Sequence, residues 1–86
     1  MSEFQLYMRH EAMEALRSLP PRNRRAVRDF IETLTQEPGR LGDFQEFDDT
    51  GRPLEVTIIG ALAVTFWCDH AVREVKVMRI CSADKV

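Results

Sequence analysis

Three apolar, β-branched runs between residues 54 and 81 constrain the fold more than any other part of the chain. Gly60 separates the first run from the second, and residues 69–71 separate the second from the third. Alternate residues of a strand point to opposite faces of its sheet. This alternation predicts one shared apolar face from the first two runs, made of Leu54, Val56, Ile58, Leu62, Val64, Phe66 and Cys68. Three such runs joined by short turns predict an antiparallel meander.

An alternating segment and two helical stripes precede the meander. Residues 3–9 alternate between apolar and polar side chains, which predicts a half-buried strand. Residues 11–19 change to the i, i+3, i+4, i+7 spacing of a short amphipathic helix, and Pro20-Pro21 ends it because proline disfavours helical geometry in the residue before it. Residues 22–37 repeat the helical spacing, so the two segments form a helical hairpin with one apolar side.

The order of these elements predicts the fold class. A strand, two helices and then three strands favour one α+β domain spanning residues 1–86, in which a two-helix hairpin packs on an antiparallel β-sheet. The first strand should join this sheet, and residues 44–47 add a short edge strand. The side chains expected to be largely buried are Leu16, Phe30, Ile31, Leu34, Val56, Ile58, Val64 and Phe66.

Length and charge narrow the functional class. A chain of 86 residues makes one small domain, which a homodimer or an obligate partner would stabilise. A net charge of -2 argues against a general nucleic-acid-binding domain, because such domains are usually basic. The chain has no apolar run of about 18 residues, and its first ten residues lack the layout of a signal peptide. A cytoplasmic protein that makes no membrane contact is expected.

Arginine accounts for ten of the twelve basic residues, and several arginines cluster on the helical hairpin. Arg25 can pair with Asp29 at i, i+4, as can Arg28 with Glu32, whereas Arg22 and Arg24 have no partner in the sequence. One interpretation is a solvated helix face. The other is a binding site for RNA phosphate, DNA phosphate or an acidic protein segment. The candidate partner-binding residues are Arg22, Arg24, Arg25, Arg28, Trp67 and Lys85.

Trp67 is the only tryptophan, and it lies on the face of its strand opposite to Val64 and Phe66. It either packs against the edge of the helices or stays exposed as an anchor for a partner protein. His70 sits in the turn after this strand, where a role as general acid or base competes with a structural one.

Metal and cofactor motifs do not emerge from the sequence. His10 is followed by Glu11 and Glu14 but not by a second histidine four residues later, so the zinc motif HExxH is not formed. The acidic segment 43–49 matches no calcium loop, and the glycines form no phosphate-binding loop. No metal and no cofactor is therefore predicted.

The helical segment resembles that of the RelE/ParE superfamily of bacterial toxin–antitoxin toxins. The pattern A-L-x-x-L-P-x-x-x-R-x-x-V…I-x-x-L occurs here as Ala15-Leu16, Leu19-Pro20, Arg24, Val27, Ile31 and Leu34, and the likeness covers nearly the whole chain. The resemblance implies a concave sheet surface that meets mRNA in the ribosomal A site or, in the ParE branch, DNA gyrase. It also implies growth inhibition, a role in plasmid stabilisation, and a cognate antitoxin encoded next to the toxin.

The resemblance to RNA-cleaving members does not extend to their basic residues. Where those members carry strand lysines, this chain has Glu55 and Thr57, and where they carry a strand arginine it has Ala63. The basic and aromatic C-terminal ending is replaced by residues 82–86. An acidic Glu55 on an RNA-facing strand is expected to repel phosphate.

Three functional hypotheses follow. The chain is a non-nuclease, ParE-like or inactive toxin that acts through its surface, which the missing basic residues favour. Alternatively, it cleaves ribosome-bound mRNA with a rearranged set of residues, for which Arg52, Arg79 and His70 are the candidates. The third alternative is a dimeric α+β interaction module that is not a toxin. The sequence leaves open whether the protein is an enzyme.

Overall fold

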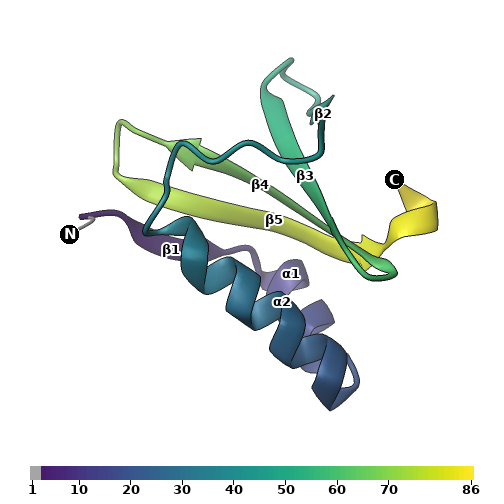
Figure 1. Ribbon diagram of the computed structural model, residues 1–86. Coiled ribbons are helices and arrows are strands. Elements are labelled where there is room, and N and C mark those ends of the chain that lie inside the picture. The colour runs from purple at the N-terminus through teal and green to yellow at the C-terminus, as the bar shows by residue number, and fades with distance from the viewer. Residues whose placement is uncertain (1–2) are drawn as a thin grey trace.

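The computed structural model describes residues 3–86, in which five strands form one sheet and two α-helices cover one of its faces (Figure 1). The strands are β1 (Gln5–Met8), β2 (Phe44–Phe47), β3 (Pro53–Ile59), β4 (Leu62–Asp69) and β5 (Glu74–Ser82). The helices are α1 (His10–Arg17) and α2 (Pro21–Leu34), and a short 3-10 helix, η1, spans Ala83–Lys85. The predicted α+β class, the helical hairpin and the edge strand at residues 44–47 are confirmed.

The sheet is mixed, with the strand order β1-β5-β4-β3-β2. Strands β2 to β5 pair antiparallel, as the meander predicted. Strand β1 joins the same sheet but pairs parallel with β5, so the prediction of an entirely antiparallel sheet is wrong at this edge. The alternation of side chains along a strand reveals its two faces but carries no information about the direction of its neighbour.

Proline positions the two helices. Pro20 precedes α2 and Pro21 is its first residue, where the missing N–H costs nothing because that N–H has no partner within the helix. Helix α1 ends at Arg17 and α2 at Leu34, each a few residues earlier than predicted. Thr35 follows α2 and still has helical backbone angles, so the helical conformation ends gradually.

The core lies between the helices and the sheet. Its buried members are Ala12, Val27, Ile31, Leu34, Val64, Phe66, Val75, Val77 and Ile80. Of the predicted core, Ile31, Leu34, Val56, Val64 and Phe66 are buried, and Leu16 and Phe30 are half-buried against it. Ile58 is 37% exposed, so its predicted burial is wrong.

A two-residue turn at Gly60-Ala61 explains the error at Ile58. Ile59 pairs with Leu62 across this turn, so every even-numbered residue of β3 faces an odd-numbered residue of β4. Cross-strand partners share a face. Leu54, Val56 and Ile58 therefore lie opposite to Val64 and Phe66, and the predicted shared face is wrong. A shift of one residue in register moves a strand's whole apolar set to the other face.

The face turned away from the helices is called the open face below. It carries Leu54, Val56 and Ile58 from β3, Ala63, Thr65 and Trp67 from β4, and Lys76, Met78, Arg79 and Cys81 from β5. A bulge shapes it, because Thr65 pairs with Arg79 but the next residue, Phe66, pairs with Val77. The extra residue, Met78, brings two consecutive side chains of β5 to the open face.

Glu55 anchors the loop that leads into β2. Its carboxylate accepts hydrogen bonds from the Gly42 backbone N–H (2.7 Å) and from Gln45 Nε2 (2.6 Å). Glu55 pairs with Phe66, so it lies on the helix side of β3 and not on the open face. The expectation that Glu55 repels phosphate from an RNA-facing surface is therefore wrong.

Within residues 3–86, neither helix has the length and apolar content that crossing a membrane requires.

Candidate functional site

A hollow of about 600 Å³ on the open face is the candidate site. Leu54, Thr65 and Met78 supply side chains from three neighbouring strands. Its charged lining residues come from the start of α1, from β2 with the turn after it, and from β5, and they are Arg9, Glu11, Glu46, Asp48, Asp49 and Arg79. Segments far apart in the sequence therefore meet at this hollow because the strand order brings β2 and β5 onto one sheet.

The arginines of the open face all have carboxylate partners. Arg79 is paired with Glu46 at 2.5 Å, and Arg9 with Glu11 at 3.2 Å. Ion pairs of this kind neutralise a large part of the positive field that a phosphate group would need. The sequence analysis considered the acidic side chains of residues 43–49 only as a possible calcium loop, and it did not predict that Glu46 reaches β5.

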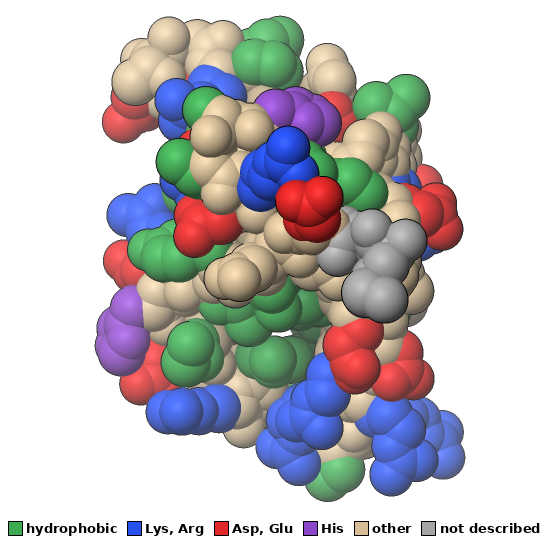
Figure 2. Space-filling view, turned by 90° about the vertical axis from the view of Figure 1, so that its left-hand side faces the viewer, with side chains coloured by type: hydrophobic (Ala, Val, Ile, Leu, Met, Phe, Trp, Pro, Cys, Tyr) green, Lys and Arg blue, Asp and Glu red, His purple; other side chains and the backbone are tan. Residues whose placement is uncertain are grey.

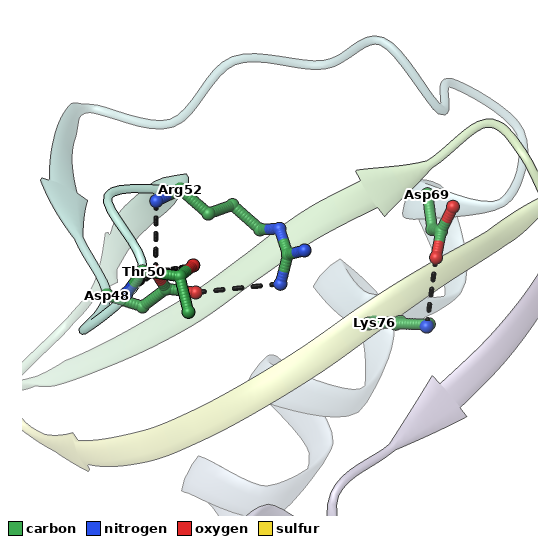
Figure 3. Close-up of polar contacts among 5 residues, drawn as sticks. All are labelled: Asp48, Thr50, Arg52, Asp69 and Lys76. Atoms are coloured by element: carbon green, nitrogen blue, oxygen red, sulfur yellow. Dashed lines mark hydrogen bonds and ion pairs between the residues drawn. The ribbon is translucent and has the colours of Figure 1, made fainter.

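The turn after β2 holds a third arginine in place (Figure 3). Asp48 Oδ1 accepts hydrogen bonds from the backbone N–H groups of Thr50 and Arg52, both 2.9 Å, and from the Thr50 hydroxyl at 2.7 Å. Its other oxygen lies 3.6 Å from the Arg52 guanidinium. Hydrogen bonding by Thr50 and then by the Arg52 backbone lowers the pKa of Asp48, so this carboxylate is ionised at neutral pH.

A fourth cation, Lys76, is held by Asp69 at the other end of the sheet (Figure 3). The two charged groups lie 3.0 Å apart, and Glu74 adds a second carboxylate at 3.8 Å from the ammonium group. The hydrogen bond from Lys76 is the main cause that lowers the pKa of Asp69. Lys76 is therefore a structural cation in this state.

Trp67 is half-buried on the open face and does not pack against the helices, so the first sequence-based interpretation of this residue is wrong. The Arg52 guanidinium lies 4.1 Å from the centre of its ring, and the Lys76 ammonium lies 5.1 Å from it. Cations over the face of an indole ring are attracted by its negative electrostatic potential. Trp67 thus tethers the same two cations that Asp48 and Asp69 bind.

The three catalytic candidates are not brought together. Arg79 lines the hollow, whereas Arg52 and His70 line a separate hollow of about 300 Å³ beside residues 38–41. His70 is exposed in the β4–β5 turn and packs edge-on against Phe4, with 5.5 Å between the ring centres. Burial raises the pKa of the nearby Cys68 thiol, which disfavours the thiolate that a cysteine nucleophile needs.

Within the part of the chain that the structure describes, the arginines of the helical hairpin have no carboxylate partner. Among residues 3–86, no ion pair involves Arg22, Arg25 or Arg28, so the pairs expected at i, i+4 with Asp29 and Glu32 are not formed. Figure 2 shows basic side chains gathered at the lower end of the molecule, where Figure 1 places the connection between the helices. Lys85 is exposed in η1, near the C-terminus of the chain.

Arg24 differs from its neighbours. Its guanidinium donates hydrogen bonds to the backbone carbonyls of Arg17 (3.3 Å) and Leu19 (3.4 Å). A cation at the carboxyl end of a helix satisfies free carbonyls and interacts favourably with the helix dipole. Arg24 therefore secures the end of α1, which is a structural role that its place in the sequence motif did not reveal.

Solved structures with the same architecture identify the fold. A chain of the archaeal RelE–RelB complex from Pyrococcus horikoshii OT3 superposes with a TM-score of 0.78 and 17% identity, and the match covers all of both chains. The chain has the RelE fold. The toxin–antitoxin complex RelBE2 from Mycobacterium tuberculosis gives a TM-score of 0.74 at 22% identity, over 92% of this chain and 96% of the other. A mutant of the E. coli toxin RelE in the free state gives 0.73 at 11% identity, over 99% and 87%.

The RelE fold is evident from the structure and not from sequence comparison. No protein-family model matches the chain, and no curated protein sequence does. Identities between 11% and 22% show that the backbone arrangement is retained while most side chains differ. The chemistry of this protein therefore depends on the residues that line its own open face.

Proposed function

We propose that this chain is the toxin of a toxin–antitoxin pair, that it inhibits growth without cleaving RNA, and that a cognate antitoxin encoded beside it neutralises it. The fold supports the first part, because two of the similar structures are described as complexes of RelE with RelB or as RelBE toxin–antitoxin complexes. The match spans at least 92% of this chain and at least 96% of the other chain in both, so it involves the whole domain and not a fragment of it.

The pairing of every open-face cation with a carboxylate carries the non-nuclease part of the proposal. Cleavage by a 2′-hydroxyl needs a base, an acid and cations near the non-bridging oxygens of the phosphate. Arg79 is the cation on β5 that lines the hollow, and its guanidinium is already paired with the Glu46 carboxylate. His70 lines a different hollow, so it does not complete an acid–base set with Arg79.

The exposed arginines of the helical hairpin are the proposed contact with the cellular target. Arg22, Arg25 and Arg28 are exposed and have no ion pair within residues 3–86, unlike the cations of the open face. Unpaired guanidinium groups bind phosphate or carboxylate groups through two parallel hydrogen bonds. A target on the ribosome would present phosphate groups or carboxylates, and so would a complex of DNA gyrase with DNA.

Lys85 and Trp67 are secondary candidates for contact with a partner protein. The exposed helical arginines do not conflict with a homodimer.

Ribosome-dependent mRNA cleavage is the second candidate function. It is favoured by one observation, the presence of Arg79 beside the buried Thr65 on the face that the RelE fold exposes. In this alternative, a bound substrate would have to displace Glu46 from Arg79 and draw Arg52 or His70 toward the phosphate.

Induced expression in bacteria tests the proposal. Growth is expected to stop when the chain is expressed alone and to continue when the neighbouring gene is co-expressed. The 5′ ends of cellular transcripts, mapped after induction, are expected to match those of uninduced cells. Codon-periodic cuts that disappear in Arg79→Ala would instead establish the second candidate function.

Charge substitution tests the proposed target contact. Changing Arg22, Arg25 and Arg28 together to Gln is expected to relieve growth inhibition while the protein remains folded and is still bound by the antitoxin. The control removes positive charge elsewhere, by changing Arg40 and Arg73, which belong to no proposed contact, to Gln. Equal relief in both variants would contradict a specific role for the helical arginines.

A further inference from the structure

The hollow on the open face has an excess of negative charge. Four carboxylates line it, from Glu11, Glu46, Asp48 and Asp49, whereas Arg9 and Arg79 are its only basic lining residues among those the structure describes. Arg52 lies outside the lining and pairs with Asp48, so within residues 3–86 Asp49 is the lining carboxylate that has no ion pair. Hydrogen bonding lowers the pKa values of Glu11 and Asp48, so both are ionised at neutral pH. A polyanion such as RNA would meet net repulsion in this hollow, and a cation would meet net attraction.

Thr65 points to a ligand independently of these charges. Its side chain lies on the open face of β4, lines the hollow and is only 1% exposed. The hydroxyl oxygen is the one buried side-chain polar atom in residues 3–86 that has no hydrogen-bond partner. Buried polar groups are almost always satisfied, and an orphan at the wall of a cavity indicates a partner that arrives with a ligand. This oxygen can accept a hydrogen bond from an ammonium or guanidinium group.

Apolar side chains lie next to this charged hollow. Phe47 lines it and is 68% exposed, and Phe44 is 44% exposed on the same short edge strand. Phe44 pairs with Val56, which places its side chain on the open face. Exposed aromatic side chains beside a polar hollow are typical of surfaces that bind other proteins.

We propose that this hollow binds a peptide segment of a partner protein, whose Arg or Lys side chain enters the hollow while flanking apolar residues cover Phe44 and Phe47. The cationic group donates hydrogen bonds to the carboxylates of Glu46 and Asp49 and to the Thr65 hydroxyl. A volume of about 600 Å³ accommodates such a side chain with part of its backbone. The proposal goes beyond the toxin function, because it would hold for an interaction module as well.

Binding of short peptides to the isolated protein tests the proposal without any measurement of toxicity. The probe is the peptide acetyl-Leu-Arg-Leu-Arg-Leu-amide, titrated into the ¹⁵N-labelled protein at low salt. Saturable shifts are expected at the backbone amides around the hollow, including those of Thr65 and Asp49. The same peptide with citrulline in place of arginine keeps the shape, lacks the charge and is expected to bind about tenfold more weakly.

Three further arms separate the alternatives. Spermidine supplies cationic charge without apolar flanks, and binding as tight as that of the peptide would overturn the peptide assignment. A short single-stranded RNA that shifts the same amides would overturn the proposal in favour of an RNA-binding face. A failure of the arginine peptide to bind saturably would also overturn it.

Two variants locate the binding site. Thr65→Val keeps the shape of the side chain and removes the orphan hydroxyl, so it is expected to leave the melting temperature unchanged or raised and to weaken peptide binding about tenfold. Asp49→Asn is expected to weaken binding at least about threefold, whereas Asp84→Asn, an exposed carboxylate in η1, serves as its control. Equal losses in the two Asn variants would show that only net charge matters and would overturn the assignment to this hollow.

Discussion

Arg79 on β5 forms an ion pair with Glu46 on β2, although β4 and β3 lie between the two strands. Neighbouring strands lie about 4.8 Å apart, so β5 and β2 would be about 14 Å apart in a flat sheet. The long side chains of Arg79 and Glu46 and the twist that sheets adopt allow the pair to form across this span. The pair thus spans the hollow and ties the short edge strand to a central strand of the sheet.

Breaking this pair should change stability only slightly. Both side chains are partly exposed, 48% for Arg79 and 29% for Glu46, and such pairs contribute about 0.2–1 kcal/mol. The expected coupling between Glu46→Gln and Arg79→Gln, measured by urea unfolding of both single variants and the double variant, is within this range. A coupling well above about 2 kcal/mol would show that the pair is a main support of the fold.

Truncating one buried core side chain and one side chain of the open face should cost different amounts of stability. Leu34 is 1% exposed in the core, so Leu34→Ala is expected to lower the free energy of unfolding by about 2–5 kcal/mol. Ile58 is 37% exposed on the open face, and Ile58→Ala should cost less than about 1.5 kcal/mol. Similar losses in both variants, measured by denaturant unfolding, would contradict the register of the β3–β4 hairpin.

Gly42 is required by a close backbone approach. A Cβ atom at this position would lie 2.5 Å from the Val56 carbonyl oxygen, which belongs to the backbone of β3 and cannot move aside freely. Gly42→Ala is therefore expected to destabilise the protein by about 1–3 kcal/mol. Gly39→Ala is the matched control, because nothing lies within 4 Å of its Cβ position. An unchanged melting temperature in Gly42→Ala would show that the loop does not dock on β3 in solution.

Acid should lower the stability of the folded protein by protonating Asp69. The hydrogen bond from Lys76 lowers the pKa of Asp69 below its ordinary value of 3.8, so the folded state holds this carboxylate ionised more strongly than the unfolded state does. Its contribution is complete above pH 3.8 and is lost as the pH falls through the lower, folded-state pKa. Asp69→Asn should therefore lose less stability than the wild type between about pH 4 and 2, as measured by thermal unfolding across pH. Identical pH profiles would contradict the pair with Lys76.

The candidate site was only partly predictable from the sequence. Arg79 and Arg52 were recognised as cations near the sheet, but their carboxylate partners were not, because Glu46 and Asp48 come from a turn whose position depends on long-range strand pairing. Thr65 carried no signal at all, since a threonine in an apolar strand is ordinary until its surroundings show that its hydroxyl lacks a partner. The resemblance to RNA-cleaving toxins predicted Glu55 on the functional face, whereas the register of β3 places it on the helix side, where it anchors the loop at Gly42.

The sequence by itself determined the elements of this protein, because local rules act over a few residues. Apolar spacing placed the two helices and the meander strands, and Pro20-Pro21 separated the helices. Tertiary structure decided the parallel pairing of β1 with β5, the face to which each β3 residue turns, and the pairing of the open-face cations. These features depend on a one-residue choice of register and on contacts between residues distant in the chain, which no local pattern specifies.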